Sequence, residues 1–295
     1  MSMTFYFCKK INTEMKAILV PIDFSKCSLD ALKFAAFTAK RSGAKIHLIS
    51  IIEKQNYYFL GSDPIVIPPE LIYSNNAHDE KLKNEIRSRL DKITRSAYLK
   101  DIPVEYKIGT GLKVFKCIEE YSRISKSDMI IMGSSGAHGI TKILIGSNAE
   151  RVSRFSKIPV LIMNHSIRNI KTIIFASDFE KEAYRVFPFV QEFAKVYDSE
   201  IHLLKVNIFT HYNNAGDIAL LKKFNKKFNS NYKEVVFESS TIASGIHKYA
   251  DKINSSMIAI GTHGKKGLIR LLFENVSEET IRYSAKPVLT VNLKK

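Results

Sequence analysis

Short apolar runs alternate with amphipathic stretches along most of the chain. Before residue 165 the apolar runs fall near 17–22, 45–52, 103–108, 128–132 and 159–163, and helical periodicity marks 27–42, 76–99, 112–125 and 147–157. After residue 166 apolar runs fall near 171–177, 200–206, 232–238, 256–260 and 287–291. Continuous Val, Ile and Leu without polar alternation is typical of strands buried on both faces. The pattern therefore predicts an α/β fold whose parallel sheets are covered by helices on both sides.

The second half of the chain repeats the first. The run KAILVPIDF that starts at Lys16 returns as KTIIFASDF from Lys171, and the runs IHL, GSSG and PVL of the first half have counterparts in IHL, GTHG and PVL of the second. Self-similarity of this kind indicates a duplicated structural unit. We expect one domain over residues 15–165 and a second over 166–295. Residues 1–14 have no counterpart in the second copy and are expected to form an N-terminal extension outside the fold.

The first copy is longer than the second, and most of the insertion lies in residues 55–75. This segment, QNYYFLGSDPIVIPPELIYSN, is apolar and contains three prolines. Two interpretations stay open, a loop that packs on its own domain and a lid or partner-docking surface.

The net charge of +16 is spread over both halves of the chain. A nucleic-acid-binding protein more often has a clustered basic patch, so we expect no specific nucleic-acid partner. The charge still attracts anionic ligands over long range. No apolar run reaches the length of about 18 residues that a membrane span requires. The three cysteines are too few and too scattered for a disulfide framework or a zinc site, which favours a reducing, cytoplasmic location.

Three groups of residues that could bind a ligand lie at the predicted carboxyl ends of two strands in the first copy. The run Pro21-Ile22-Asp23 ends the first strand, and its carboxylate suits a ribose hydroxyl or an adenine amine. The run 132–136, MGSSG, follows the fourth strand, where glycine allows close approach of the backbone to a phosphate. The run Gly146-Ser147-Asn148 opens the last helix, whose N–H groups and dipole favour an anion. Ligands of open parallel sheets bind at such strand ends.

The spacing G-x2-G-x9-G-[ST] after a strand, with Asp at the end of the first strand, resembles the ATP-binding class of the universal stress protein family. The resemblance covers both copies and implies two flavodoxin-like domains in tandem, each doubly wound around a five-stranded parallel sheet. It also implies bound ATP, with Mg²⁺ as an accompanying ion, and pairing of the two domains through their last strands. A homodimer is a further expectation. The residues that the resemblance assigns to the nucleotide are Pro21, Ile22, Asp23, Ile51, Met132, Gly133, Gly136, Gly146, Ser147 and Asn148.

Each of these residues also has a purely structural interpretation. Ser147 followed by Glu150 forms a capping-box pattern that suits any helix. Gly133 is suited to ending a strand, and Asp23 to capping the following helix. The order and spacing of all the features together favour the nucleotide interpretation.

The second copy departs from the motif. Gly261 and Gly264 are kept, but Glu274-Asn275 stands where the first copy has Gly146-Ser147. Asn275 still begins a helix well, whereas a carboxylate about 4 Å from a phosphate charge costs roughly 4 kcal/mol at an effective dielectric of about 20. Lys265 and Lys266 offset part of that repulsion. We therefore expect one ATP per chain.

The sequence favours a regulatory nucleotide-binding protein over an enzyme. Near the glycine loop, no acid, base and nucleophile stand at catalytic spacing, and the chain has no G-x4-G-K-[ST] motif. One alternative is a slow ATP-hydrolysing or adenylate-forming enzyme of the related adenine-nucleotide hydrolase type. Such enzymes carry a Ser/Gly-rich loop after the first strand, where this chain has PIDFS. A second alternative is a protein that binds nucleic acid or membrane surfaces through its positive charge.

Overall fold

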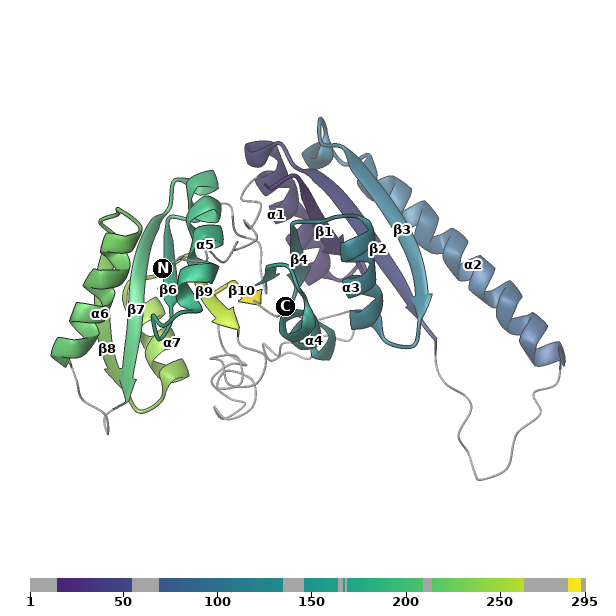
Figure 1. The fold of residues 1–295 in the computed structure, drawn as a ribbon. Helices are drawn as coiled ribbons and strands as arrows, with labels where there is room; N and C mark the ends of the chain where they lie inside the picture. The colour runs from purple at the N-terminus through teal and green to yellow at the C-terminus, as the bar shows by residue number, and fades with distance from the viewer. Residues whose placement is uncertain are drawn as a thin grey trace, which may run out of the picture. The chain divides into compact units, whose positions relative to one another are not determined.

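The computed structural model describes residues 15–54, 69–134, 146–163, 167, 169–208, 214–262 and 286–292. Its backbone divides into two compact units, Ala17–Arg168 and the part that starts at Asn169 (Figure 1). In both units strands and helices alternate and all the strand pairs are parallel. The predicted α/β fold with two similar copies in tandem is thereby confirmed.

The N-terminal unit contains five strands in the order β3-β2-β1-β4-β5. They are β1 (Ala17–Pro21), β2 (Lys45–Glu53), β3 (Val104–Gly111), β4 (Met129–Gly133) and β5 (Val160–Met163). Its helices are α1 (Lys26–Ser42), α2 (Pro69–Thr94), α3 (Val114–Ile124) and α4 (Ser147–Phe155), with a 3-10 turn at Ala97–Leu99. The order reverses between β1 and β4, as in a doubly wound sheet.

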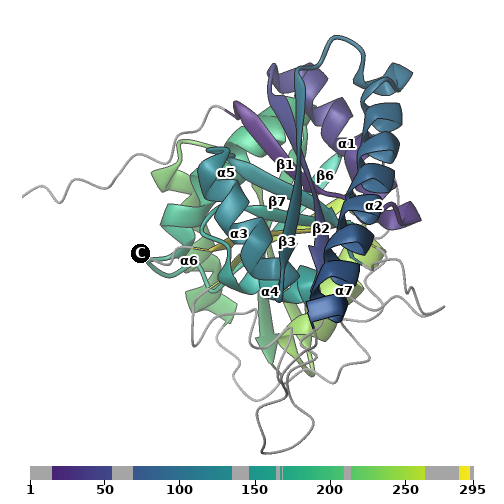
Figure 2. The ribbon, with the colours of Figure 1, turned by 90° about the vertical axis from the view of Figure 1, so that its right-hand side faces the viewer.

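Side chains of the first sheet point alternately to two helical layers. Leu19 and Ile130 pack with Ile118 of α3 and Val152 of α4 in one buried cluster. Helix α1 contacts β1 and β4, and α2 contacts β3. Figure 2, which brings this unit toward the viewer, shows α1 and α2 on one side of the strands and α3 and α4 on the other. The core therefore lies in two layers, one on each side of β1 and β4.

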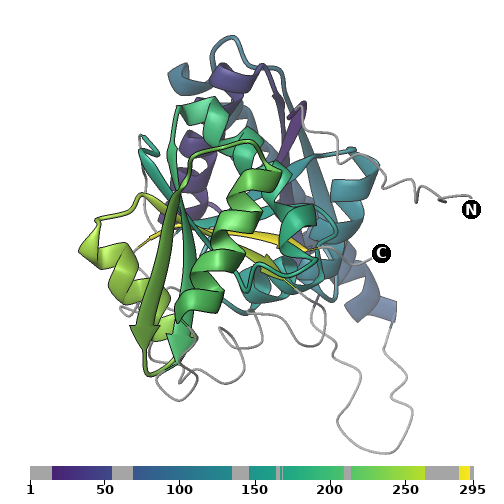
Figure 3. The ribbon, with the colours of Figure 1, turned by 60° about the vertical axis from the view of Figure 1, so that its left-hand side comes forward.

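The C-terminal unit repeats this order as β8-β7-β6-β9-β10 (Figure 3). Its strands are β6 (Thr172–Ala176), β7 (Glu200–Ile208), β8 (Lys233–Ser239), β9 (Met257–Thr262) and β10 (Val288–Asn292). Its described helices are α5 (Ala183–Tyr197), α6 (Asn214–Lys227) and α7 (Ile242–Lys252). Helix α7 packs on one face against an aliphatic cluster that includes Ile174 and Ile258. The side chain of Phe175 instead contacts Phe187 of α5 and Phe224 of α6.

The predicted helix over 76–99 needs correction at both ends. Helix α2 begins at Pro69 and ends at Thr94, so residues 69–75 are helical and the loop interpretation of the insertion is wrong for them. Proline suits the first turn of a helix, where its missing N–H is not needed. Ser96 adopts an extended backbone and ends the helical run before the 3-10 turn. Residues 55–68 lie outside the described residues, as do residues 1–14.

Candidate functional site

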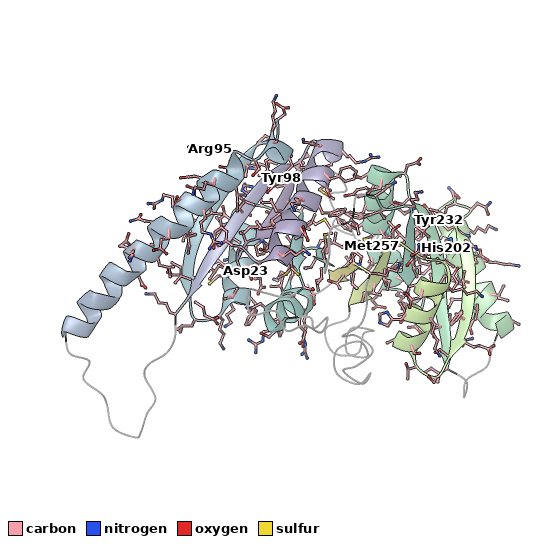
Figure 4. All side chains as sticks on the ribbon, turned by 180° about the vertical axis from the view of Figure 1, so that it is seen from behind. Asp23, Arg95, Tyr98, His202, Tyr232 and Met257 are labelled. Carbon is pink, nitrogen blue, oxygen red and sulfur yellow. The ribbon has the colours of Figure 1, made fainter. Side chains whose placement is uncertain are left out.

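The turn after β1 positions Asp23 at the carboxyl end of the first sheet. Asp23 is exposed, and its Oδ1 accepts a hydrogen bond of 3.0 Å from the amide of Ser25. Ser25 is the N-cap of α1 and accepts in turn from the amide of Ser28. Asp23 therefore braces the turn before the helix, whereas the direct helix cap is Ser25. In Figure 4, Asp23 lies apart from Arg95 and Tyr98, which follow α2 in the chain.

Gly133 is the last residue of β4 and lies against the first turn of α1. A Cβ atom built on Gly133 would come within 2.8 Å of the carbonyl carbon of Cys27 and 2.9 Å of the amide nitrogen of Ser28. Real Cβ atoms do not approach a backbone so closely, so only glycine fits without moving α1. Gly133 thus does more than end a strand, since it brings the end of β4 against the helix that follows the Asp23 turn.

Two backbone hydrogen bonds fix Ser134, and one of them joins the two halves of the glycine motif. Ser134, which is buried, donates its amide to the carbonyl of Met163 at 2.7 Å. Its own carbonyl accepts from the amide of Gly146. Residues 135–145, including Gly136, lie outside the described residues, but both ends of that segment are thereby held together. The motif spacing does not predict a role for Ser134, whose signal in the sequence is its place directly after Gly133.

Helix α4 begins immediately after this hydrogen bond. Gly146 is its N-cap and has no side-chain capping bond, and the carbonyl of Gly146 accepts from the amide of Glu150 at 3.1 Å. The capping-box interpretation of Ser147 is therefore wrong, because Ser147 is the first helical residue. Ser147 is exposed and Asn148 is half-buried. Arg154 in the last turn and Glu150 in the first both suit the helix dipole.

The remaining candidate residues lie around the same strand ends with different exposure. Ile22 is buried and donates its amide to the carbonyl of Ile49 at 2.8 Å, which ties the Asp23 turn to β2. Met132 is buried and Ile51 half-buried, and both pack in the cluster beneath α3 and α4. Pro21 is half-buried at the end of β1. Because β1, β2 and β4 are parallel neighbours, all these residues share one edge of the sheet.

The matching place in the C-terminal unit is only partly described. Gly261 lies near the end of β9, and Asp178 follows β6. Asp178 Oδ1 accepts from the amide of Glu180 at 3.1 Å, so the turn after the first strand is built alike in both units. Gly264, Glu274 and Asn275 lie outside the described residues, and the expected loss of this second site stays a prediction.

The model of the universal stress protein family matches residues 14–164 and again 169–292. The chain belongs to the universal stress protein family. Over 148 residues it is 31% identical to a universal stress protein of Methanocaldococcus jannaschii, MJ0531, covering 50% of this chain and 81% of the relative. Over 292 residues it is 22% identical to Slr1230, a universal stress protein of Synechocystis, covering 94% of this chain and 99% of the relative.

A solved universal stress protein from Archaeoglobus fulgidus has the same fold as the whole chain. The two superpose with a TM-score of 0.68 at 24% identity, covering 96% of this chain and 98% of the other. The predicted tandem arrangement of two universal stress protein domains with flavodoxin-like topology is confirmed. Within the described residues, no helix combines the length and apolar character needed to cross a membrane.

Proposed function

We propose that the N-terminal unit of this universal stress protein binds ATP and that the protein acts in regulation, through ATP-dependent conformation or partner binding. The carrying observation is the backbone hydrogen bond between Ser134 and Gly146, which brings the two halves of the glycine motif together at the end of β4. Asp23 lies at the end of the adjacent strand β1. In this proposal Asp23 meets the ribose and adenine, while the start of α4 and the glycine segment hold the phosphates.

Calorimetric titration with ATP, and nucleotide extraction from the purified protein, test the proposal. Replacing Asp23 by Ala should weaken ATP binding by about 1–3 kcal/mol, because a hydrogen-bonding partner of a bound ligand is removed. The matched control is Asp178→Ala, which removes the same type of turn hydrogen bond from the C-terminal unit. ATP affinity should stay unchanged in that control. Equal weakening by both variants, or no ATP binding by the wild type, would contradict the proposal.

The glycine motif is tested by Gly136→Val, because a β-branched side chain should block close approach of the backbone to a phosphate. A folded Gly136→Val protein with wild-type ATP affinity would refute the phosphate assignment. Titrations with and without Mg²⁺ determine whether the metal ion accompanies ATP.

We further propose that one ATP binds per chain, because Glu274 replaces the glycine of the motif in the second copy. The pair of changes Glu274→Gly and Asn275→Ser, made in a Gly136→Val protein, should create ATP binding in the C-terminal unit. If the unmodified protein binds two equivalents of ATP with similar affinity, the effect assigned to Glu274 is wrong.

An assay of single-turnover hydrolysis with labelled ATP separates the regulatory proposal from the enzyme alternative. In the described part of the site, the turn after β1 consists of Ile22, Asp23, Phe24 and Ser25 and contains no glycine. Pairing of the two copies through residues 159–163 and 287–291, a homodimer, a cytoplasmic location and the absence of a specific nucleic-acid partner stay predictions.

A further inference from the structure

The turn after the first strand, which carries Asp23 in the N-terminal unit and Asp178 in the C-terminal unit, contains a strained residue in both. Phe24 has a φ of 63° and Phe179, at the matching position, has a φ of 62°. A non-glycine residue in this left-handed region is unfavourable unless its surroundings hold it there. The contacts of the two phenylalanine rings therefore bear directly on the position of the carboxylate one residue earlier.

In the C-terminal unit this turn is enclosed by other protein groups. Phe179 is fully buried, and its ring lies 5.0 Å from the ring of Phe224 in α6 and 5.8 Å from that of Phe175 in β6. The amide of Phe179 also donates to Oγ of Ser177 at 3.1 Å. Ser177 has no equivalent in the N-terminal unit, where Ile22 stands at the matching position.

In the N-terminal unit the ring of Phe24 contacts a cationic side chain, whereas Phe179 contacts aromatic rings. The guanidinium carbon of Arg89, on α2, lies 3.9 Å from the centre of the Phe24 ring. Phe24 is half-buried and Arg89 is exposed. A planar guanidinium at this distance attracts the face of an aromatic ring. Among the residues that the structure describes, the charged partner of the Phe24 ring is thus a solvent-accessible side chain on α2.

We propose that Arg89 is a positioning residue for the nucleotide site, which holds the Phe24 turn and thereby presents Asp23. This inference rests on the proposed ATP function and adds a regulatory link to it. Whatever displaces α2 also withdraws Arg89 from Phe24, so the turn loosens and ATP affinity falls. Linkage requires the reverse effect as well, so that bound ATP steadies α2.

The first measurement needs no nucleotide. In Arg89→Met the side chain keeps its apolar stem but loses its charge and planar group. The amide of Ser25 donates a hydrogen bond to Asp23. Hydrogen–deuterium exchange of this amide should become about two- to fivefold faster, in line with the strength of an exposed cation–π contact. The matched control is Arg87→Met, also exposed on α2, whose guanidinium bonds to Asn84 of the same helix. This control should leave the exchange of the Ser25 amide unchanged.

The second measurement is a double-mutant cycle with ATP. Arg89→Met should weaken ATP binding by about two- to fivefold, and should have no further effect in an Asp23→Ala protein, because Arg89 acts through Asp23. Arg89→Lys, which keeps the charge but loses the planar stack, should fall between Met and the wild type. Added ATP should slow amide exchange in α2 of the wild type and not in Arg89→Met.

The outcomes separate the two proposals. Unchanged Ser25 exchange in Arg89→Met overturns the positioning role whether or not ATP binds. A weakening of ATP binding that persists in the Asp23→Ala background also overturns it, since Arg89 would then act by another route. Failure of the wild type to bind ATP overturns the proposed function, and the positioning role is then decided by the Ser25 amide alone.

Discussion

His47 in the N-terminal unit and His202 in the C-terminal unit occupy matching positions on the second strand of each sheet, yet their surroundings differ. His202 is buried and fully bonded, because its Nδ1 lies 2.8 Å from Oη of Tyr249 and its Nε2 lies 2.9 Å from Oε1 of Glu200. Within the residues that the structure describes, neither ring nitrogen of His47 has a hydrogen-bond partner, although the ring is equally buried.

The charges around the two rings are exchanged between the units. Two residues before His47 stands Lys45, and the cross-strand neighbour on β3 is Glu105, whose carboxylate lies 3.4 Å from Nδ1 of His47. Two residues before His202 stands Glu200, and the cross-strand neighbour on β8 is a lysine. Burial and Lys45 together lower the pKa of His47, which Glu105 only partly offsets. The duplicated units thus share the backbone and the histidine, whereas the side chains that hydrogen-bond to the ring differ.

The largest expected difference between the units lies in how the helix after the second strand is held. The ring of Phe224, on α6, lies within about 6 Å of five other aromatic rings and is fully buried. Replacing Phe224 by Ala should lower the free energy of unfolding by about 3–5 kcal/mol, because a large cavity opens in the cluster. Urea unfolding followed by circular dichroism measures the change.

Phe155, which is 40% exposed and packs against the ring of Phe115 in the N-terminal unit, provides the control. Phe155→Ala should cost about 1–2 kcal/mol, because the ring is only partly buried and its removal opens to solvent and leaves no closed cavity. Similar losses in both variants would show that the aromatic cluster does not anchor α6.

The second comparison concerns the glycine that ends the fourth strand of each sheet. Gly133→Ala should destabilise the N-terminal unit by about 3 kcal/mol, because its Cβ would meet the backbone of α1 within 2.9 Å. At Gly261 the nearest atom is a side-chain methyl of Val186 at 3.1 Å, which has room to adjust. Gly261→Ala should therefore cost about 1 kcal/mol or less. Equal costs, measured by urea unfolding, would contradict the close approach at Gly133.

A smaller effect is expected at the bonded histidine. His202→Phe keeps the ring shape but leaves Tyr249 and Glu200 without their partner, so it should cost about 1–3 kcal/mol at neutral pH. His47→Phe removes a ring with no hydrogen bonds among the described residues, and should be nearly neutral or stabilising at the same pH. Thermal unfolding of the two variants decides this, and a larger loss in His47→Phe would refute the contrast.

The smallest effect is a pH dependence. Burial lowers the pKa of both His47 and His247 in the folded protein below the ordinary value of 6.5. As the pH falls through about 6.5, the unfolded chain binds protons that the folded chain resists, so stability declines. Replacing His47 by Gln should reduce the slope of unfolding free energy against pH below 6.5. His247→Gln should reduce it independently, and an unchanged slope in both variants would contradict the lowered pKa values.

Much of the fold was predictable, because buried parallel strands leave continuous apolar runs. The run near 17–22 became β1 at Ala17–Pro21, and the run near 45–52 became β2 at Lys45–Glu53. The sequence does not predict the start of α2, because a proline such as Pro69 is as typical of loops as of the first turn of a helix.

Only those parts of the candidate site that follow from the spacing of residues along the chain were predictable. Sequence spacing relates Gly133 to Gly146, but the close approach of Gly133 to Cys27 depends on how α1 packs on β4. Likewise, the contact of Arg89 with Phe24 joins α2 to a distant turn. Both contacts arise from tertiary packing, which no local pattern in the chain records.

The hydrogen bond between Ser134 and Gly146 has a consequence for evolution and engineering. Because the two anchors are backbone groups, and Ser134 is also fixed to Met163 of β5, the intervening segment is a cassette with fixed ends. Exchanging residues 135–145 for the matching segment of another family member should leave β4 and α4 in place. In the proposed site, ligand preference would then be exchanged separately from the scaffold of the N-terminal unit.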